Sequence, residues 1–316
     1  YTFEDHARGE RDETIFKYRF PMTFDAAGNP SGGVHFAQLI HWIGHTREIG
    51  IRPSGLYQAA INHVASGQYA WVTKETALRI VGSANAGDLI EVECWNERMY
   101  GTDDASLEMI YQWYSVSPEG TRRRLAESAQ TTTWARVLGH GIVESTPYPD
   151  DMEPWLAASL PSHAQGTRGL SWSSADDVGA VLWEAAPGPQ PGMFLTEESF
   201  RTTPRNGNMV GNVYWANYFD WMGEVRDLWA QAHVPFGEGE LRCTGTEIQH
   251  LREAMPGDQV VVKMYLEKRC ERGFGFSFSF FREDPEGLTK LAQGHQTASW
   301  FVPRGGSWEP GEAFSL

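Results

Sequence analysis

Two stretches of this chain carry the same 20-residue motif, and this duplication limits the fold more than any other feature. Residues 29–48 and 208–227 lie 179 positions apart. Two shorter matches follow in the same order, residues 86–92 with 256–262 and residues 125–134 with 291–300. Three matches in one order predict two copies of a single structural unit. Seven positions of the long motif are identical: Asn29/Asn208, Gly32/Gly211, Val34/Val213, Ala37/Ala216, Trp42/Trp221, Gly44/Gly223 and Arg47/Arg226.

Each copy predicts the same order of secondary structure. An extended segment leads into a Gly/Asn-rich turn, and a long helix follows, with apolar residues at three- and four-residue steps. Strands then begin directly after Gly-Asp turns. We therefore expect an α+β fold in which an antiparallel sheet wraps around a central helix. The helices are expected near residues 34–50 and 212–232, and the strands at 14–20, 89–95, 107–115 and 124–137 in the first copy and at 198–203, 260–266, 274–281 and 288–302 in the second.

The domain boundaries follow from this pattern. A chain of 316 residues is long enough for two domains, each with its own core. We place the N-terminal domain at residues 1–137 and the C-terminal domain at 194–316. Residues 138–193 are rich in proline, serine, alanine and glycine, so they are predicted to form a linker with a short helix near 153–159.

Composition excludes several classes of protein. There is no run of 18 apolar residues for a membrane span, and residues 1–6 lack the pattern of a secretory signal. Three cysteines, an odd number without paired spacing, favour a reducing compartment, and we expect a cytoplasmic protein. The net charge of −15 disfavours nucleic-acid binding, and an anionic carrier would need a local basic cluster. The clusters available are Arg122/Arg123/Arg124, Arg201/Arg205 and Arg269/Arg272.

Cofactor and metal motifs are absent. The chain has no glycine-rich nucleotide loop, no G-x-S-x-G sequence and no H-E-x-x-H sequence. His41 and His45 lie one turn apart on the first predicted helix, but no acidic residue or cysteine follows at ligand spacing. We expect neither a cofactor nor a metal.

The element that repeats is Asn-x-x-Gly at a helix entrance, with an arginine 15 residues after the glycine. Glycine allows positive φ or a close backbone approach. Amides at a helix N-terminus favour negative charge, so an oxyanion formed from a carbonyl would be stabilised there. Asn29 and Asn208 would add a donor or hold water. The alternative is that each is an ordinary N-cap.

At this motif the chain resembles the hot-dog thioesterases of the 4-hydroxybenzoyl-CoA thioesterase group, whose central helix opens with D-x-x-G-H-V-N-N-x-x-Y. The second copy, from Asn208 to Tyr218, is most similar to the thioesterases of enediyne polyketide pathways, in which N-L-V-G-N-V-Y precedes N-Y-x-x-W-x-G-x-x-R-E. The first copy departs from this pattern, with His35 and Gln38 where the family has tyrosine and asparagine. The resemblance implies two fused copies, a double hot-dog fold, and it allows homo-oligomers of such units.

The resemblance also implies a role for each candidate residue. Asn29 and Asn208 replace the family's aspartate, and asparagine is neither a nucleophile nor a general base. Hydrolysis would then depend on polarising the thioester and positioning water. Arg226, or Arg47 in the first copy, would pair with an oxyanion, a β-keto oxygen or a terminal carboxylate, and the alternative for Arg226 is a surface salt bridge with Glu224 or Asp227. Tyr214 and His35, placed one turn inside each predicted helix, would donate a hydrogen bond or protonate the leaving thiolate, and the alternative is that they are core residues.

The sequence therefore predicts a thioesterase-like enzyme that acts on an acyl group, expected to be a polyketide, carried by an acyl carrier protein or CoA. The pocket containing Asn208 and Arg226 is favoured because the second copy fits the family better. The alternatives are a dehydratase, cyclase or acyltransferase on the same scaffold, with His35 as base, or a silent acyl-binding module. The expected substrate contacts are Gly211, Asn212, Val213, Asn217 and Tyr218.

Overall fold

The computed structural model describes most of the chain. The described residues are 15–23, 26, 28–29, 31–51, 55–100, 106–139, 142–152, 156, 192–208, 211–235 and 237–314. The chain divides into two compact units. The first contains Tyr1–Thr23 and Leu39–Ser171, and the second contains Phe24–Gln38 and Trp172–Leu316. The segment that leads into the first helix therefore belongs to the second unit.

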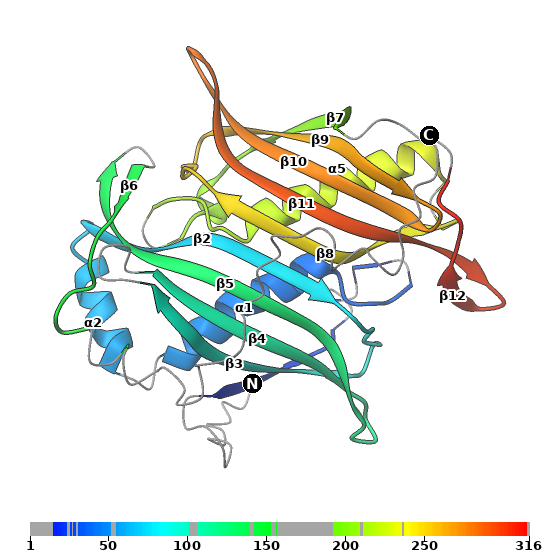
Figure 1. Cartoon of the computed structure of the whole chain (residues 1–316), viewed down its shortest axis with the longest axis horizontal. Helices are drawn as coiled ribbons and strands as arrows, with labels where there is room; N and C mark the ends of the chain where they lie inside the picture. The colour runs from blue at the N-terminus through cyan, green and yellow to red at the C-terminus, as the bar shows by residue number, and fades with distance from the viewer. Residues whose placement is uncertain are drawn as a thin grey trace. The chain divides into compact units, whose positions relative to one another are not determined.

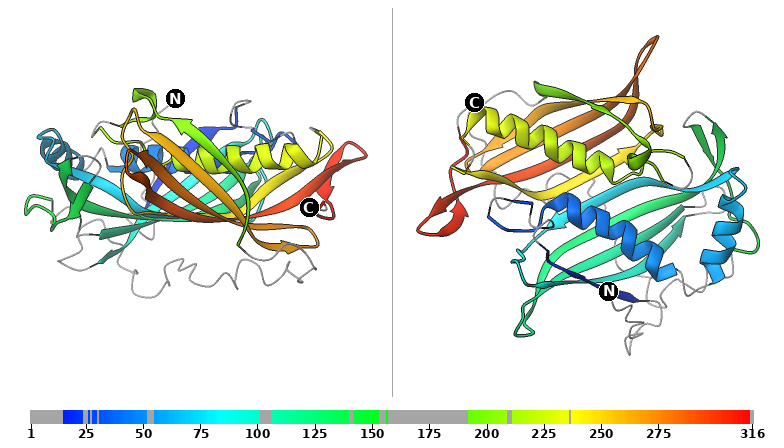
Figure 2. Two further views of the ribbon diagram at one scale, coloured as in Figure 1. Left: turned by 90° about the horizontal axis from the view of Figure 1, so that it is seen from above. Right: turned by 180° about the vertical axis from the view of Figure 1, so that it is seen from behind.

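The first unit is a helix on an antiparallel sheet with strand order β1-β3-β4-β5-β2 (Figure 1). The long helix α1 lies across one face of these strands when they are seen from behind (Figure 2). A short strand, β6, pairs with β5. The elements are β1 (Phe16–Pro21), α1 (Phe36–Ile51), α2 (Gly55–Val64), β2 (Tyr69–Ile80), β3 (Leu89–Tyr100), β4 (Ser106–Val116), β5 (Arg122–Gly139) and β6 (Ile142–Ser145).

The second unit repeats this arrangement, with strand order β8-β11-β10-β9-β7 and β12 paired to β11. Helix α5 packs against β7, β8 and β9. The elements are β7 (Met193–Arg201), the 3-10 turn η1 (Pro204–Asn206), α5 (Asn217–His233), β8 (Glu240–His250), β9 (Gln259–Cys270), β10 (Gly273–Asp284), β11 (Gly287–Arg304) and β12 (Ser307–Pro310).

The repeated tryptophans have the same role in both units. Trp42 of α1 stacks on Phe20 of β1, with ring centroids 4.8 Å apart. Trp221 of α5 stacks on Phe200 of β7 at 5.7 Å. Each tryptophan thus joins its helix to the first strand of its copy, and stacked aromatic pairs add stability beyond the apolar area they bury.

The fold is α+β, as the sequence predicts, and the six predicted strands that follow the helices are all present. The elements β2, β8 and α2, which lie between the helices and the Gly-Asp turns, were missed, and so were the short elements η1, β12 and β6, the last of which lies within the predicted linker. The helices also begin later than predicted, at Phe36 and Asn217. Of the predicted linker, residues 140–141, 153–155 and 157–191 lie outside the described residues, and so does most of its predicted short helix.

The repeated Asn-x-x-Gly forms the same turn in both copies. The amide of Gly32 donates to the carbonyl of Asn29 at 2.8 Å, and the amide of Gly211 donates to Asn208 at 3.1 Å. Both glycines have positive φ, 80° and 86°. A side chain is strained in that region, so the identity of these glycines in the two copies is a backbone requirement.

We predict that Gly211→Ala lowers the free energy of unfolding by about 1–2 kcal/mol, the usual cost of left-handed backbone for a residue with a Cβ atom. Urea denaturation measures it. Gly211→Asn is the matched control and should lose less, because asparagine tolerates this conformation better. Equal losses in the two variants would contradict the explanation.

Candidate functional site

A cavity of about 250 Å³ lies in the second unit, between the C-terminal half of α5, the start of β8 and the turn at Asn29. One side is apolar and the other carries two carboxylates and two amides, which is the mixed lining expected of a small-molecule site. The lining residues are Gly28, Asn29, Asp227, Ala230, Gln231, Val234, Gly239, Glu240, Leu241 and Trp300.

Asn29 lines this cavity and belongs to the lead segment of the first copy, which is the stretch of chain just before α1. Its Nδ2 donates to the carbonyl of Val34 at 3.2 Å, which closes the turn and fixes the side chain. An amide nitrogen carries two hydrogens, so the second remains for a ligand. The amides of His35, Ala37 and Gln38 already donate to protein acceptors. Asn29 is therefore a better donor to the cavity than the start of α1, where the sequence places the oxyanion site.

His35 precedes the first residue of α1, and both of its ring nitrogens are engaged. Nδ1 accepts from the amide of Ala37 at 3.3 Å. In the neutral ring the proton is then on Nε2, which lies 3.8 Å from Oδ2 of Asp227. His35 is thus oriented as a proton donor toward Asp227.

Arg226, which precedes Asp227 on α5, is fully buried, with 1% of its side chain exposed. Its Nε donates to Oδ1 of Asp227 at 2.8 Å, and its Nη1 donates to Oε1 of Gln296 at 2.9 Å. The guanidinium lies 5.2 Å from the ring centroid of Phe36. A bond to the neighbouring aspartate was considered from the sequence, but only on the helix surface. The guanidinium is instead inside the unit and holds a carboxylate at the cavity.

The environment of Asp227 favours its ionised form. Burial raises the pKa of this carboxyl, but the charge of Arg226 and the hydrogen bonding and charge of His35 outweigh burial, so the pKa lies below its usual value. Asp227 is 41% exposed and lines the cavity. It is an anionic oxygen with fixed orientation and access to a ligand.

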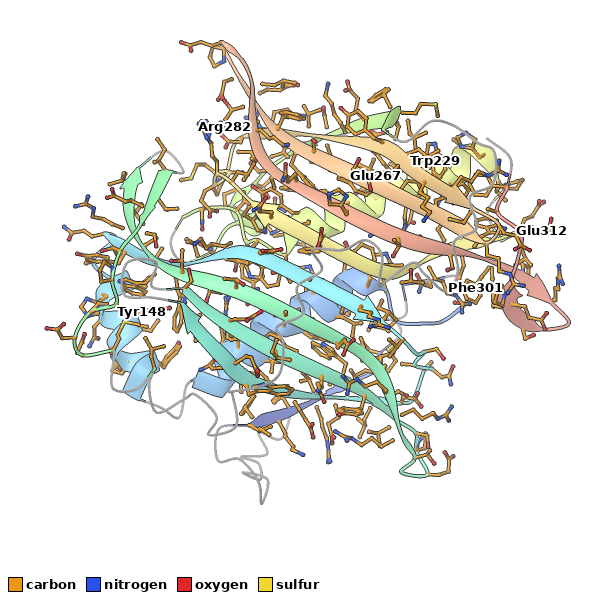
Figure 3. All side chains as sticks on the ribbon, in the orientation of Figure 1. Tyr148, Trp229, Glu267, Arg282, Phe301 and Glu312 are labelled. Carbon is orange, nitrogen blue, oxygen red and sulfur yellow. The ribbon has the colours of Figure 1, made fainter. Side chains whose placement is uncertain are left out.

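Glu240 is the second carboxylate of the cavity wall, and its charge is compensated. Its Oε2 accepts from the amide of Ser31 at 3.0 Å, and its Oε1 pairs with Nε of Arg242. The guanidinium of Arg242 lies 4.0 Å over the ring of Phe301, which is labelled in Figure 3. Glu240 therefore ties the lead segment to β8.

Arg47, the counterpart of Arg226, repeats only part of this network. Its Nη1 donates to Oε1 of Gln130 at 2.9 Å, as Arg226 does to Gln296. Gln130 and Gln296 occupy matched positions of the third repeat match. The Arg–Gln bond is thus a shared feature of the two copies, and the sequence alone does not reveal it.

The other predicted residues of the second copy lie in the turn before α5 and at the first two positions of that helix. Asn217 donates to the carbonyls of Asn206 and Tyr214, and Asn212 donates to Glu253 at 2.7 Å. Burial raises the pKa of Glu253 to about 7, although the bond from Asn212 opposes the shift. Val213 and Tyr218 are each 1% exposed. None of the predicted substrate contacts and catalytic groups in this region lines the cavity. These residues are Asn208, Gly211, Asn212, Val213, Tyr214, Asn217 and Tyr218.

The favoured pairing of Asn208 with Arg226 in one pocket stays a prediction, and neither residue lines the cavity described above. Asn208 precedes α5, whereas Arg226 lies nine residues into it, roughly 14 Å along the helix axis at 1.5 Å per residue. The residues brought together are Asn29 and His35 of the first copy with Arg226 and Asp227 of the second. The N-cap alternative is also wrong for Asn208, because Ala216 caps α5. Tyr214 likewise precedes α5 and does not lie one turn inside it.

Asp227, Glu240 and Trp300 were not predicted as site residues. The signal for Asp227 is that an acidic residue follows the repeated arginine in both copies, Glu48 and Asp227. Glu240 and Trp300 have no such signal, because strand pairing brings them to the cavity.

The described part of the chain holds no group of three or more His, Cys, Asp and Glu side chains suited to a metal ion. Its helices include none with the length and apolar character needed to cross a bilayer. The three cysteines are free and buried.

Solved structures show the same fold. The chain is similar to an acyl-ACP thioesterase from Bacteroides thetaiotaomicron, with a TM-score of 0.59 and 9% identity over 91% of this chain and 98% of that one. It is also similar to the 12:0-ACP thioesterase from Umbellularia californica, with a TM-score of 0.60 and 11% identity over 94% and 98%. No protein-family model and no curated protein matches the sequence. The hot-dog resemblance is confirmed at the level of the fold.

We predict that Arg226→Ala lowers the free energy of unfolding by on the order of 3 kcal/mol, because it empties the buried site of the guanidinium and leaves the buried amide oxygen of Gln296 without its donor. The sequence alone suggests a melting temperature that changes little, and burial of the guanidinium reverses that expectation. Arg47→Ala is the matched control and should lose about 1 kcal/mol, since it removes one hydrogen bond at a half-buried site. Chemical denaturation measures both, and equal losses would contradict the prediction.

Proposed function

We propose that this protein is a cytoplasmic thioester hydrolase with two hot-dog units in tandem. Its substrate is an acyl group, expected to be a polyketide, on an acyl carrier protein or CoA. The reaction takes place at the cavity of the second unit. The observation that carries this proposal is the ionised Asp227, held by Arg226 and facing the cavity beside Asn29 and His35. Solved thioesterases of the same fold support the reaction class.

The arrangement supplies each group that hydrolysis requires. The free amide hydrogen of Asn29 polarises the thioester carbonyl. Asp227 accepts a proton from water as the water oxygen bonds to the carbonyl carbon. The tetrahedral intermediate then collapses, the C–S bond breaks, and the leaving thiolate takes the proton that Asp227 accepted from water, while His35 helps to hold Asp227 in orientation. Water is consumed, and a carboxylic acid and a thiol are released.

This division of roles differs from the Asn/Arg mechanism implied by the motif. Arg226 already bonds Asp227 and Gln296, so it does not pair with an oxyanion. It acts through Asp227 as a positioning residue. The cavity has the carboxylate that Asn29 and Asn208 lack, supplied from the middle of α5 instead of from the turn.

Of the alternatives, a dehydratase requires a free base on His35. Removal of an α-proton needs an unprotonated ring nitrogen facing the substrate. Nδ1 of His35 accepts from Ala37, and Nε2 faces Asp227. This geometry disfavours a dehydratase and favours hydrolysis. Intact-mass measurement of an acyl carrier protein substrate distinguishes free acid, dehydrated thioester and unchanged substrate.

We predict that Asp227→Asn lowers kcat for thioester hydrolysis by at least about 100-fold, the usual contribution of a general base. Because the pKa of Asp227 lies below its ordinary value, wild-type kcat should be flat above about pH 5 and fall only in more acid solution. Arg226→Gln should move this acidic limb upward, since it removes the charge that lowers the pKa. The control is Asp220→Asn, on the same helix and outside the cavity lining. Unchanged kcat in Asp227→Asn would overturn the assignment.

The basic clusters considered for carrier docking differ in their surroundings. Arg122 pairs with Glu91 and Glu93, and Arg124 pairs with Glu127, so two of the three arginines in that cluster are already paired with carboxylates. Arg272 is exposed, and its carbonyl accepts from the amide of Trp300 in the cavity wall. Of the three clusters, Arg269/Arg272 is the one with a residue bonded to that wall.

We predict that Arg272→Glu raises KM for an acyl carrier protein substrate several-fold at low salt, because the acidic carrier is then repelled. The effect should fade as salt screens the charge, and hydrolysis of a small acyl thioester should not change. Arg201→Glu, at an exposed position on β7, is the control and should leave both KM values unchanged. An equal rise in KM for both substrates would refute docking.

A further inference from the structure

Trp134 and Trp300 occupy equivalent positions in the two units, but the residues beside them differ. On β11, Trp300 lies opposite Leu241 of β8. On β5, its repeat partner Trp134 lies opposite Trp71 of β2. Counting two residues back along each partner strand, Gly239 in the second unit corresponds to Tyr69 in the first. A residue without a side chain and a large aromatic residue thus occupy matched positions.

In the first unit, rings fill the space around the tryptophan. Tyr69 stacks on Trp134 with centroids 5.9 Å apart and planes 11° apart. Trp71 and Tyr148, the latter labelled in Figure 3, lie 6.4 and 6.3 Å from Trp134. Trp134 is completely buried in this cluster.

In the second unit, the indole of Trp300 takes the place that a side chain at Gly239 would occupy. A Cβ atom at Gly239 would overlap the indole of Trp300. Gly239 and Trp300 both line the cavity, together with Leu241 and, on α5, Ala230 and Val234. The absence of one side chain allows the indole to lie flat against the backbone as a cavity wall.

The charges around the cavity select against an anionic ligand. Asp227 and Glu240 both line it. The nearest guanidinium groups, Arg226 and Arg242, are committed to these two carboxylates. A terminal carboxylate on the ligand would meet like charge, and the described residues that line the cavity include no free cation to compensate it.

The volume limits the size of the ligand. A cavity of about 150 Å³ holds a benzene ring, which has six non-hydrogen atoms. The cavity here, about 250 Å³, therefore corresponds to roughly ten such atoms.

We propose that this cavity is the acyl-selective pocket of the enzyme and that it takes an uncharged acyl group of roughly ten non-hydrogen atoms, with the indole of Trp300, packed against Gly239, as one wall. The proposal rests on the thioester hydrolase function proposed above and names the substrate class for that site. In the first unit the matched position holds Tyr69, whose ring stacks on Trp134.

The test measures kcat/KM for butyryl-, octanoyl-, dodecanoyl- and hexadecanoyl-CoA, and for suberyl-CoA, which is octanoyl-CoA with a terminal carboxylate. Wild-type protein should prefer octanoyl-CoA, with a loss of roughly tenfold or more for hexadecanoyl-CoA, the scale of discrimination by methylene groups. Gly239→Tyr, which copies the first unit, should lower octanoyl-CoA hydrolysis by about tenfold or more relative to butyryl-CoA. Trp300→Leu should shift the preference toward dodecanoyl-CoA. Glu240→Gln should reduce the preference for octanoyl- over suberyl-CoA.

Matched controls separate the pocket from general effects of substitution. Gly275→Ala on β10, where a Cβ atom meets ordinary contacts, and Trp308→Leu on β12 should leave the chain-length profile unchanged. Gly239→Ala is the milder variant if Gly239→Tyr does not fold, as judged by thermal melting. It should shift the preference toward butyryl-CoA.

Binding of octyl-CoA, the thioether analogue, measured by calorimetry, separates this proposal from hydrolysis itself. Hydrolysis of every chain length at similar rates, unaffected at Gly239 and Trp300, would overturn the pocket while the hydrolase function stands. Absence of hydrolysis with octyl-CoA binding that depends on Gly239 would overturn the hydrolase function while the pocket stands. Efficient hydrolysis of suberyl-CoA by wild-type protein would overturn the charge selection.

Discussion

The buried guanidinium of Arg226 is the interaction on which the site depends. A charge with 1% exposure is stable only where its hydrogens are satisfied, and Asp227 and Gln296 satisfy them from α5 and β11. The same bonds fix the helix against the sheet and leave the second oxygen of Asp227 directed to His35. The hydrogen bonds that attach α5 to β11 and those that orient Asp227 therefore belong to one network, so a substitution of Arg226 affects both.

The duplicated chain uses its symmetry for stability and its differences for function. The Trp–Phe stack between helix and first strand, the positive-φ turn and the Arg–Gln bond occur in both copies. Glu240 and Gly239 are replaced by Ala70 and Tyr69 at the matched positions of the first copy, and the counterpart of Asp227 is Glu48, also acidic. Duplication of a stable scaffold leaves one copy free to fill its space with aromatic rings, because the other retains an open cavity.

The parts of the fold that could be predicted are those set by residues close together in the sequence. Periodicity and turn residues are local, so the helices, the strands after the Gly-Asp turns and the α+β class could be predicted. Strands β2 and β8 were missed because their alternation is weak, and their partners, β5 and β11, lie more than 40 residues away along the chain. The helix starts were placed too early because the repeated motif begins as a turn whose first residue is seven or more positions ahead of the helix.

The sequence by itself determined that this chain has two related units and that Gly32 and Gly211 are required by the backbone. It also identified Asn29, His35 and Arg226 as candidate site residues. These conclusions need only local chemistry and internal comparison. Tertiary structure decided which of them meet. It joined the lead segment of the first copy to the helix of the second, buried Arg226 and brought Glu240 and Trp300 to the cavity. The reason is physical: a carboxylate acquires its orientation and pKa from partners that strand pairing and helix packing bring from distant positions, and residue spacing does not encode them.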